Sequence, residues 1–282
     1  MNRFPLIVLL TDFGTLDPYV AILKGVISQI APGVQIIDLS NEIPPGDIQR
    51  AAITLWQSYA YLPPDSVIVC VIDPGVGTSR RGVIVQSGSH TYIGPDNGIF
   101  THVARKGYKA WELSNPKYML SIPGKTFHGR DIFAPAAGYV TRGVAGAEFG
   151  QAINDLHWLP QPLFEWKDQD KLRGEILYSD RFGNLITSLG CFVQSSDGLI
   201  ELNPWLPGVP EVQFSSIDVR LELPNGSLLS WKETFAEVPA DQCGVIIGSS
   251  GLLEIVANCQ SAERLLGVCR GAPVTLIVNK RS

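Results

Sequence analysis

The sequence predicts an α/β N-terminal domain with a mainly parallel central sheet, followed by a smaller all-β, barrel-like C-terminal domain. Aliphatic runs alternate with amphipathic stretches over the first 160 residues, and short strand-like runs separated by turn signals fill the rest. The length of 282 residues allows two domains. The predicted boundaries are 1–165 and 172–282.

The N-terminal half has a β-α-β rhythm. Residues 6–10 form a continuous aliphatic run, typical of a strand buried on both faces. Residues 17–30 carry apolar side chains at three- and four-residue steps, with Asp17-Pro18 as a start signal and Pro32-Gly33 as a stop. Further strands are predicted at 34–39, 67–72 and 82–86, and a second helix at 47–61.

The character of the chain changes near residue 160. Leu159–Pro162 and the charged run 167–171 resemble a linker. Strands are predicted beyond it at 174–179, 212–214, 217–223, 244–247, 252–256 and 274–278. Asn225-Gly226 is a hairpin-type turn pair. These runs predict a small β-rich domain, either a sandwich or a barrel.

Composition excludes several classes of protein. The net charge is 22 − 27 = −5, which argues against a sequence-independent nucleic-acid binder. No apolar run reaches the roughly 20 residues that span a bilayer. The short apolar run near the N-terminus does not fit a signal peptide, so we expect a cytoplasmic protein.

The five cysteines are odd in number and widely spaced, with no CxxC pair. They predict buried free thiols rather than a zinc or redox site.

Candidate chemistry gathers at the expected carboxyl edge of the sheet, where open α/β sheets bind ligands. Asp12 follows the first strand and Asp73 follows the third. Polar groups also occur at 96–98 and 126–131, where His128 alone among the four histidines has charged neighbours on its C-terminal side.

Common nucleotide and nucleophile motifs do not fit. Arg80 stands where a dinucleotide loop beginning at Gly75 would need its third glycine, and Met119 stands where a phosphate loop ending at 124–126 would need its first. There is no serine in a nucleophile elbow and no HExxH helix. A covalent serine or cysteine mechanism is therefore not predicted.

Six short motifs occur in a fixed order along the chain. They are Leu9–Gly14, Asp17–Val20, Val71–Thr78, Pro95–Gly98, Thr126–Asp131 and Asp180–Asn184. In combination they resemble the S-adenosyl-L-methionine hydroxide adenosyltransferase family, also called DUF62, which is related to the fluorinase and chlorinase enzymes. The resemblance extends from about residue 6 to 278.

The resemblance implies an enzyme that hydrolyses S-adenosyl-L-methionine to adenosine and L-methionine, without a metal or another cofactor. It also implies a homotrimer in which the N-terminal domain of one subunit and the C-terminal domain of its neighbour share each active site. No nucleic acid or membrane partner is expected.

The resemblance also assigns residues. The implied catalytic set is Asp73, Arg80 and His128. As hypotheses, Asp73 is a candidate base that the adjacent Arg80 would weaken, Arg80 polarises and places the attacking water, and His128 relays its proton. The implied substrate-binding residues are Asp12 for the ribose hydroxyls, Phe127 beside His128, Asp180 and Ser250 for the amino and carboxylate groups of methionine, and Phe182, Asn184 and Asn258 for the adenine and methionine side.

Gly129 bears on the choice of nucleophile. According to the resemblance, the halogenating relatives have a Phe-Tyr-Ser stretch at this place, and its serine helps to hold the halide. This chain has Phe127-His128-Gly129. Without a hydroxyl at Gly129, water is the expected nucleophile.

Two other functions stay open at the level of sequence. Asp12, Asp73, Asp96, His128 and Asp131 have the ligand chemistry of a metal-dependent hydrolase acting on a nucleotide-like substrate. The same scaffold could instead bind S-adenosylmethionine or adenosine without turnover. Resistance to a chelator and analysis of the products discriminate among the three.

Overall fold

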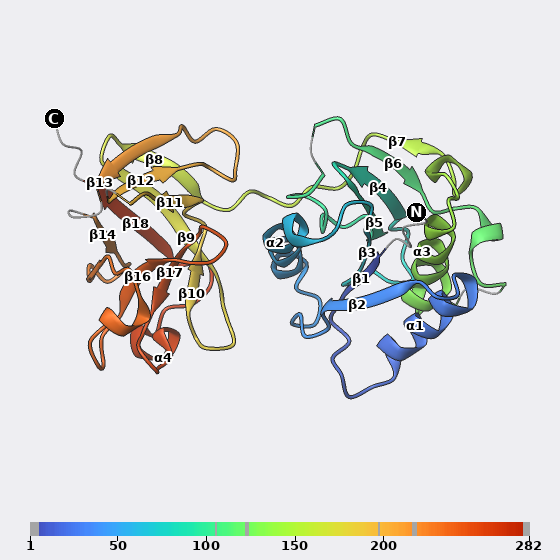
Figure 1. The fold of residues 1–282 in the computed structure, drawn as a ribbon, viewed down its shortest axis with the longest axis horizontal. Helices are drawn as coiled ribbons and strands as arrows, with labels where there is room; N and C mark the ends of the chain where they lie inside the picture. Colours follow the sequence, from blue (N-terminus) through green and yellow to red (C-terminus); the bar gives the residue numbers. More distant parts are fainter. Residues whose placement is uncertain (1–5, 105, 122–123, 197, 216–218, 279–282) are drawn as a thin grey trace. The chain divides into compact units, whose positions relative to one another are not determined.

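The computed structural model describes residues 6–104, 106–121, 124–196, 198–215 and 219–278. The chain divides into two compact units, Met1–Leu159 and Pro160–Ser282 (Figure 1).

A mixed seven-stranded sheet forms the centre of the first unit. Its strands follow the order β2 (Gln35–Ser40), β1 (Leu6–Thr11), β3 (Val67–Val71), β5 (His90–Pro95), β4 (Gly82–Ser87), β6 (Lys109–Glu112) and β7 (Ala152–Ile153). Neighbours from β2 to β5 pair in parallel, whereas β4–β5, β4–β6 and β6–β7 are antiparallel.

The prediction of a mainly parallel sheet is therefore wrong for the second half of this sheet. Strands β4 and β5 are joined through Gly88 and Ser89 only, and Gly88 has a φ of 59°. A connection this short can only make a hairpin, because a parallel pair needs a crossover of a dozen or more residues.

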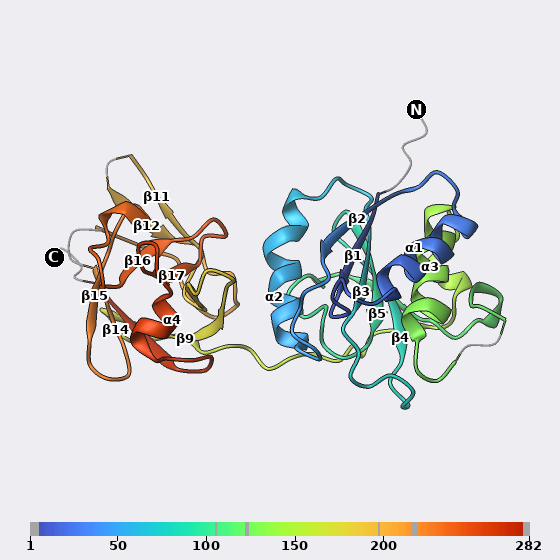
Figure 2. The same ribbon diagram turned by 90° about the horizontal axis from the view of Figure 1, so that it is seen from below.

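Helices cover both faces of this sheet (Figure 2). The helices α1 (Tyr19–Ile30) and α3 (Ala134–Thr141) pack against each other over one face, and α2 (Ile48–Ser58) packs on the other. Asp47 caps α2, since its side chain accepts a 3.0 Å hydrogen bond from the Arg50 amide.

Differences from the predicted helices lie mainly at their ends. The first helix begins at Tyr19 rather than at residue 17, and the second changes to a 3₁₀ turn at Tyr59–Tyr61. The π-helical turn Gly129–Phe133 and the following α3 were not predicted. Further 3₁₀ turns are Pro116–Tyr118, Gly146–Glu148 and Phe235–Glu237.

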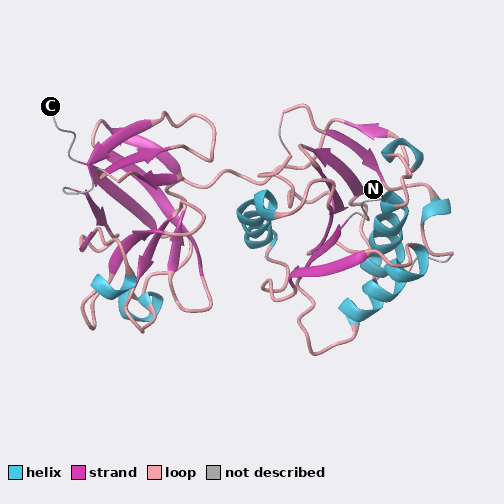
Figure 3. Ribbon diagram, viewed as in Figure 1, coloured by secondary structure: helices cyan, strands magenta, loops and turns pink. Residues whose placement is uncertain are grey.

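The second unit is built around an antiparallel, nearly closed barrel-like sheet (Figure 3). Its order is β15 (Leu228–Ser230), β14 (Val219–Glu222), β18 (Pro273–Val278), β9 (Lys171–Ser179), β10 (Leu185–Thr187), β17 (Leu253–Val256) and β16 (Gly244–Ile247), and β8 (Phe164–Asp168) also pairs with β9. The two ends approach one another, because the Lys232 amide donates a 2.8 Å hydrogen bond to the Val245 carbonyl. A smaller sheet contains β11 (Phe192–Gln194), β12 (Leu199–Leu202) and β13 (Val212–Ser215), and α4 spans Ala262–Leu266.

Two local predictions for this unit need comment. The charged run 167–171, expected in a linker, instead forms the end of β8 and the start of β9, where polar side chains suit an exposed hairpin. Residues 217 and 218 of the predicted strand 217–223 lie outside the described residues, and β14 occupies Val219–Glu222. Asn225-Gly226 does turn the β14–β15 hairpin, with a φ of 81° at Gly226.

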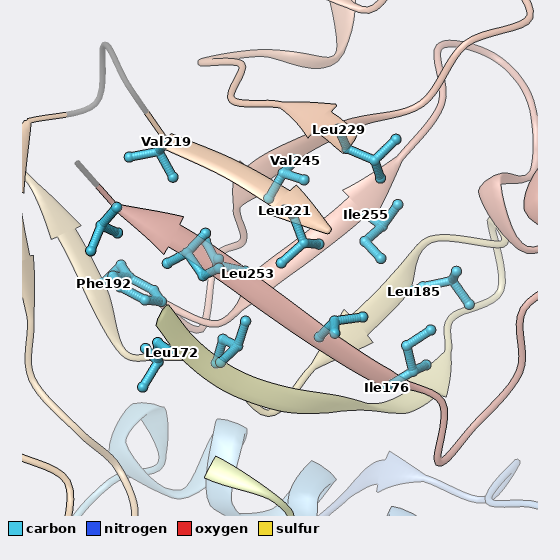
Figure 4. Packing of buried hydrophobic residues seen from close by; sticks show 14 of the residues in the cluster. Leu172, Ile176, Leu185, Phe192, Val219, Leu221, Leu229, Val245, Leu253 and Ile255 are labelled. Atoms are coloured by element: carbon cyan, nitrogen blue, oxygen red, sulfur yellow. The ribbon is translucent and has the colours of Figure 1, made fainter. Parts of the chain in front are cut away.

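Inward-pointing aliphatic side chains hold the barrel together (Figure 4). Leu172 and Ile176 from β9, Leu221 from β14 and Leu253 from β17 are almost completely buried in one cluster. Buried and partly buried residues alternate along most of β9, which is the pattern of a strand with one face toward a core.

The cysteines only partly follow the prediction of buried thiols. All five are free, and Cys70 is buried in β3, where burial raises the pKa of its thiol. Cys259 and Cys269 are exposed, so the prediction is wrong for these two. Within the described ranges, no helix is long and apolar enough to cross a membrane.

The core of the first unit gives a test of the fold. Leu9 is fully buried in β1, whereas Leu16 is fully exposed in the following loop. We expect Leu9→Ala to lower the free energy of unfolding by about 2–5 kcal/mol, through lost burial and the cavity left behind. Urea-induced unfolding measures this, and Leu16→Ala is the matched control, expected within about 0.5 kcal/mol of the wild type. Equal effects of the two variants would contradict this packing.

Candidate active site

A cavity of about 320 Å³ opens at the carboxyl ends of β1 and β3. Asp12 directly follows β1, and Asp73 lies two residues beyond the end of β3. Because these strands are parallel neighbours, both carboxylates reach the same edge of the sheet. The cavity is lined by Asp12, Phe13, Pro45, Gly46, Val71, Asp73, Pro74, Val76, Thr126, Phe127, His128 and Gly129.

Arg80 joins two of the predicted catalytic residues. Its Nε donates a 2.8 Å hydrogen bond to Asp73 Oδ1, and its terminal Nη2 donates to Asp73 Oδ2. The same Nη2 lies 2.6 Å from Nδ1 of His128. Only 11% of the Arg80 side chain and 6% of the Asp73 side chain are exposed. The structure thus brings Asp73, Arg80 and His128 into one hydrogen-bonded unit.

This contact defines the tautomer of His128. A guanidinium can only donate hydrogen bonds, so Nδ1 must accept and the ring proton must lie on Nε2. Burial, followed by the positive charge of Arg80, lowers the pKa of His128, although Asp73 and Asp131 oppose the shift. His128 is therefore a neutral hydrogen-bond donor at pH 7.

The loop that carries His128 is braced from within. The buried Asp131 carboxylate accepts a 2.7 Å hydrogen bond from the Gly124 amide and pairs with Nε of Arg130 at 2.6 Å. Burial alone would raise the pKa of Asp131, but these hydrogen bonds outweigh it and hold that pKa below its usual value. Asp131 thus supports the loop and has little freedom to hold a ligand.

Two glycines let this loop approach its neighbours closely. Gly77 has a φ of 79°, and a Cβ there would lie 2.5 Å from the Lys125 carbonyl oxygen. A Cβ at Gly129 would lie 3.2 Å from Cγ1 of Val71. The loop after β3 and the loop 124–131 are therefore packed backbone to backbone, which fixes the distance between Asp73 and His128.

Asp12 occupies a different part of the cavity wall. Its Oδ2 accepts a 2.8 Å hydrogen bond from the Gly46 amide. Burial raises the pKa of Asp12, despite that hydrogen bond, and the nearby charge of Asp73 adds to the shift. The carboxylate keeps lone pairs that can accept hydrogen bonds from hydroxyl groups.

Asp96 and Asn97 serve the scaffold rather than the cavity. Asp96 accepts a 3.0 Å hydrogen bond from Nε of Arg81, which also binds Asp155 at 2.9 Å. Asn97 donates a 2.9 Å hydrogen bond to the Ile72 carbonyl, just before Asp73. The adjacent arginines thus have separate contacts, because Arg80 binds Asp73 and lies beside His128, whereas Arg81 braces Asp96 and Asp155.

The second unit contains its own cavity of about 710 Å³, between the β9–β10 loop and residues 257–264. Asp180 shapes that loop, since its Oδ1 accepts hydrogen bonds from the amides of Phe182 at 2.8 Å and Asn184 at 2.9 Å. Phe182 is 78% exposed at the rim. Asn258 also lines this cavity.

Ser250 is the one predicted binding residue that lines neither cavity. It lies in the turn between β16 and β17. Sequence reasoning also missed residues that do line the cavities, namely Phe13, Phe235, Gln260, Glu263 and Arg264. Phe13 lies inside the quoted Leu9–Gly14 motif, whereas the charged and polar residues around Phe235 (232–237) are typical of any exposed loop and contain no motif that would mark a ligand site.

The metal-site alternative finds little support in the geometry. Within the described ranges, no group of three or more His, Cys, Asp or Glu side chains is arranged to hold a metal ion. Three of its five proposed ligands, Asp73, Asp96 and Asp131, are instead paired with arginines.

Comparison with known proteins places the chain in a family. Residues 7–150 match the family model of the SAM hydroxide adenosyltransferase N-terminal domain, and residues 174–275 match that of the C-terminal domain. The chain therefore belongs to the SAM hydroxide adenosyltransferase family.

Individual relatives span nearly the whole chain. An (R)-S-adenosyl-L-methionine hydrolase from Thermus thermophilus is 38% identical over 95% of this chain and 98% of its own length. One from Methanocaldococcus jannaschii is also 38% identical, over 93% and 92% of the two chains. A fluorinase from an Actinoplanes species is 29% identical over 67% of this chain and 72% of its own. An uncharacterized conserved protein from Thermotoga maritima matches in structure with a TM-score of 0.81, at 30% identity over 96% of this chain and 99% of its own.

The His128–Arg80 contact gives a measurable pKa. We expect His128 to titrate below the usual 6.5 and Arg80→Met to raise that pKa, because the arginine charge is removed and the Asp73 carboxylate is left unpaired. Histidine ring signals followed by NMR against pH test this, with the His128→Gln spectrum identifying the signal. Arg81→Met is the control, since Arg81 does not contribute to the shift. An unchanged His128 pKa in Arg80→Met would refute the arrangement.

Proposed function

We propose that the chain hydrolyses S-adenosyl-L-methionine to adenosine and L-methionine by in-line attack of water on ribose C5′. The observation that carries the proposal is the Asp73–Arg80–His128 unit, in which Asp73 and His128 line the sheet-edge cavity and Arg80 joins them from outside its lining. Membership of the SAM hydroxide adenosyltransferase family and the hydrolase names of full-length relatives support it.

The reaction needs a base but no acid. A bond forms between the water oxygen and C5′, the C5′–S bond breaks, and its electron pair neutralises the sulfonium. Methionine leaves as an uncharged thioether, so one proton is released per turnover, and it comes from the attacking water. Fixing that water in line with the C5′–S bond can remove about 7–11 kcal/mol from the barrier.

The hydrogen-bond pattern suggests how the three residues divide this work. Nδ1 of His128 accepts from Arg80, so His128 is not free to relay a proton through Nδ1. Its Nε2–H has the Gly124 backbone as a hydrogen-bond partner, and we assign this donor to orient the water oxygen when substrate and water are bound. This differs from the sequence-based hypothesis of a His128 relay. Both oxygens of Asp73 accept from Arg80 but keep a second lone pair each, so Asp73 is the group that can take the proton.

Neighbouring residues of the cavity fit the rest of the reacting centre. We assign the ribose hydroxyls to Asp12, whose free lone pairs face no arginine. Gly129 provides no hydroxyl for a halide, and a Cβ there would lie only 3.2 Å from Cγ1 of Val71. Phe127 gives the cavity an apolar wall that limits competing water.

We further propose that the enzyme is a homotrimer whose active sites combine the two kinds of cavity from neighbouring subunits. The reacting groups line the cavity of the first unit, whereas the exposed Phe182 and Phe235, with Asn184 and Asn258, line that of the second. Exposed rings are suited to stack on adenine. Asp180 is held by backbone amides, so its contact with the methionine amino group would use its remaining lone pairs.

Activity of single variants tests the catalytic set. We expect purified protein to convert S-adenosylmethionine to adenosine and methionine, and Asp73→Asn and His128→Gln each to lower kcat by about 10²–10⁴-fold. Chromatography of the products measures both. Asp65→Asn and His157→Gln are the matched controls, because they make the same substitutions at residues that do not line the cavity. Both are expected to keep wild-type turnover.

Two additions to the same assay address the rival functions. Turnover should survive a strong chelator, and adenosine should remain the product with chloride or fluoride present. Binding without turnover would favour a sensor, and loss of activity on chelation would favour the metal-dependent hydrolase.

Mixed oligomers test the shared site. Asp73→Asn removes the first cavity's base, and the double variant Phe182→Ala/Phe235→Ala removes the rings of the second. In a cyclic trimer containing both kinds of subunit, only one of the three sites would be intact, so we expect activity of about one-third of the wild type. Co-expression with two affinity tags isolates such trimers. A fully active monomer by light scattering, or mixed trimers as inactive as their parents, would contradict the proposal.

A further inference from the structure

Three aromatic rings cluster beside the reacting groups. Phe13 follows β1, Tyr19 begins α1 and Phe127 precedes His128. Their ring centroids lie 5.6 Å apart for Phe13–Tyr19, 5.7 Å for Phe13–Phe127 and 5.3 Å for Tyr19–Phe127. Phe13 and Phe127 line the cavity, whereas Tyr19 is exposed and contacts both rings without lining it.

The cluster already holds one cation by its ring faces. The guanidinium carbon of Arg130 lies 5.3 Å from the centroid of Phe127, within the range of a cation–π interaction. That arginine is neutralised by Asp131 and does not line the cavity. Phe13 has no such cation among the described contacts, so its ring is available to a ligand.

The carboxylates of the cavity leave little free negative charge for a cationic ligand. Asp73 is paired with Arg80, and burial raises the pKa of Asp12. A sulfonium is bulky and weakly hydrated, and it cannot donate a strong hydrogen bond. Aromatic faces in a water-poor cavity are therefore a suitable means to bind it.

We propose that the cluster of Phe13, Tyr19 and Phe127 is the sulfonium subsite, and that Phe13 is the specificity-determining residue that favours S-adenosylmethionine over its uncharged, demethylated thioether, S-adenosylhomocysteine. This rests on the proposed function. The two ligands share adenosine and an amino-acid tail, so a selective device must act at sulfur.

The interaction has an unusual consequence for the rate. The positive charge on sulfur disappears as C5′–S breaks, so a ring that stabilises the sulfonium stabilises the bound substrate more than the transition state. Removing the ring should raise KM while kcat stays the same or rises. A residue needed only for packing would instead lower kcat.

The test compares Phe13→Leu with the wild type. We expect Phe13→Leu to raise KM for S-adenosylmethionine by about 2- to 30-fold, the range of cation–π energies, without a fall in kcat. The inhibition constant of S-adenosylhomocysteine should change less than about 2-fold, because the neutral thioether gains nothing electrostatic from the ring. Phe13→Tyr keeps an aromatic face and should retain the wild-type ratio of the KM for S-adenosylmethionine to the inhibition constant of S-adenosylhomocysteine. Tyr61→Leu, 79% exposed and outside the cavity, is the matched control.

The outcomes separate this inference from the proposed function. Equal weakening of both ligands in Phe13→Leu, or a fall in kcat that Phe13→Tyr does not restore, overturns the sulfonium subsite while hydrolysis by the wild type still stands. If the wild type does not hydrolyse S-adenosylmethionine, the proposed function fails. The affinities of both ligands for the wild type and Phe13→Leu, measured by calorimetry, then still decide whether Phe13 favours the charged ligand over the neutral one. Replacing Phe13 with pentafluorophenylalanine, of equal shape but reversed ring quadrupole, should weaken S-adenosylmethionine as Phe13→Leu does. Unchanged selectivity in that protein would also overturn the inference.

Discussion

The candidate active site depends on one buried guanidinium. Arg80 neutralises Asp73, sets the tautomer of His128, and has its guanidinium carbon 5.4 Å from the centroid of the Phe133 ring. It therefore ties the loop after β3 to the segment 124–133, which follows strands β4, β5 and β6 in the chain. Breaking a buried ion pair by removing one partner costs about 3–5 kcal/mol, because the other charge is left uncompensated. Catalytic geometry and local stability thus rest on the same interaction.

This arrangement also explains how much of the molecule could be predicted from sequence. Continuous aliphatic runs and turn signals indicated β1, β3 and most strands of the second unit, because burial on one or both faces leaves a direct pattern. Strand β5, with its His, Thr and Pro, carries no such pattern, and the β4–β5 hairpin changed the sheet from mainly parallel to mixed. Which strands pair with one another depends on the loops that connect them, and a local sequence pattern does not reveal this.

The sequence likewise predicted some features of the candidate site and not others. Asp73, Arg80 and His128 meet in the structure, although neither their distances nor the direction of the His128 proton could be read from the chain. The sequence did not distinguish the brace Arg81 from Arg80 on physical grounds, and Phe13 appeared only as part of the Leu9–Gly14 motif. Ser250 lies apart from both cavities because the β16–β17 turn, rather than the cavity wall, determines its place.

The residues around the cavity carry little unpaired charge. One carboxylate is paired with arginine, another is pushed by burial toward its neutral form, and aromatic and aliphatic groups make up much of the remaining wall. Such a cavity suits a reaction in which a cation enters and neutral products form. If the aromatic cluster is the proposed sulfonium subsite, its ring contacts favour substrate binding over the rate of the chemical step.

The most direct test of the account follows the oxygen atom of the solvent. Hydrolysis in ¹⁸O-labelled water, with mass spectrometry of both products, reports which carbon the water attacks. We expect one ¹⁸O in the 5′-hydroxyl of adenosine and none in methionine. Unlabelled adenosine, label in the amino-acid product, or products from cleavage at another carbon of the sulfonium would contradict attack on C5′ at the Asp73–Arg80–His128 unit.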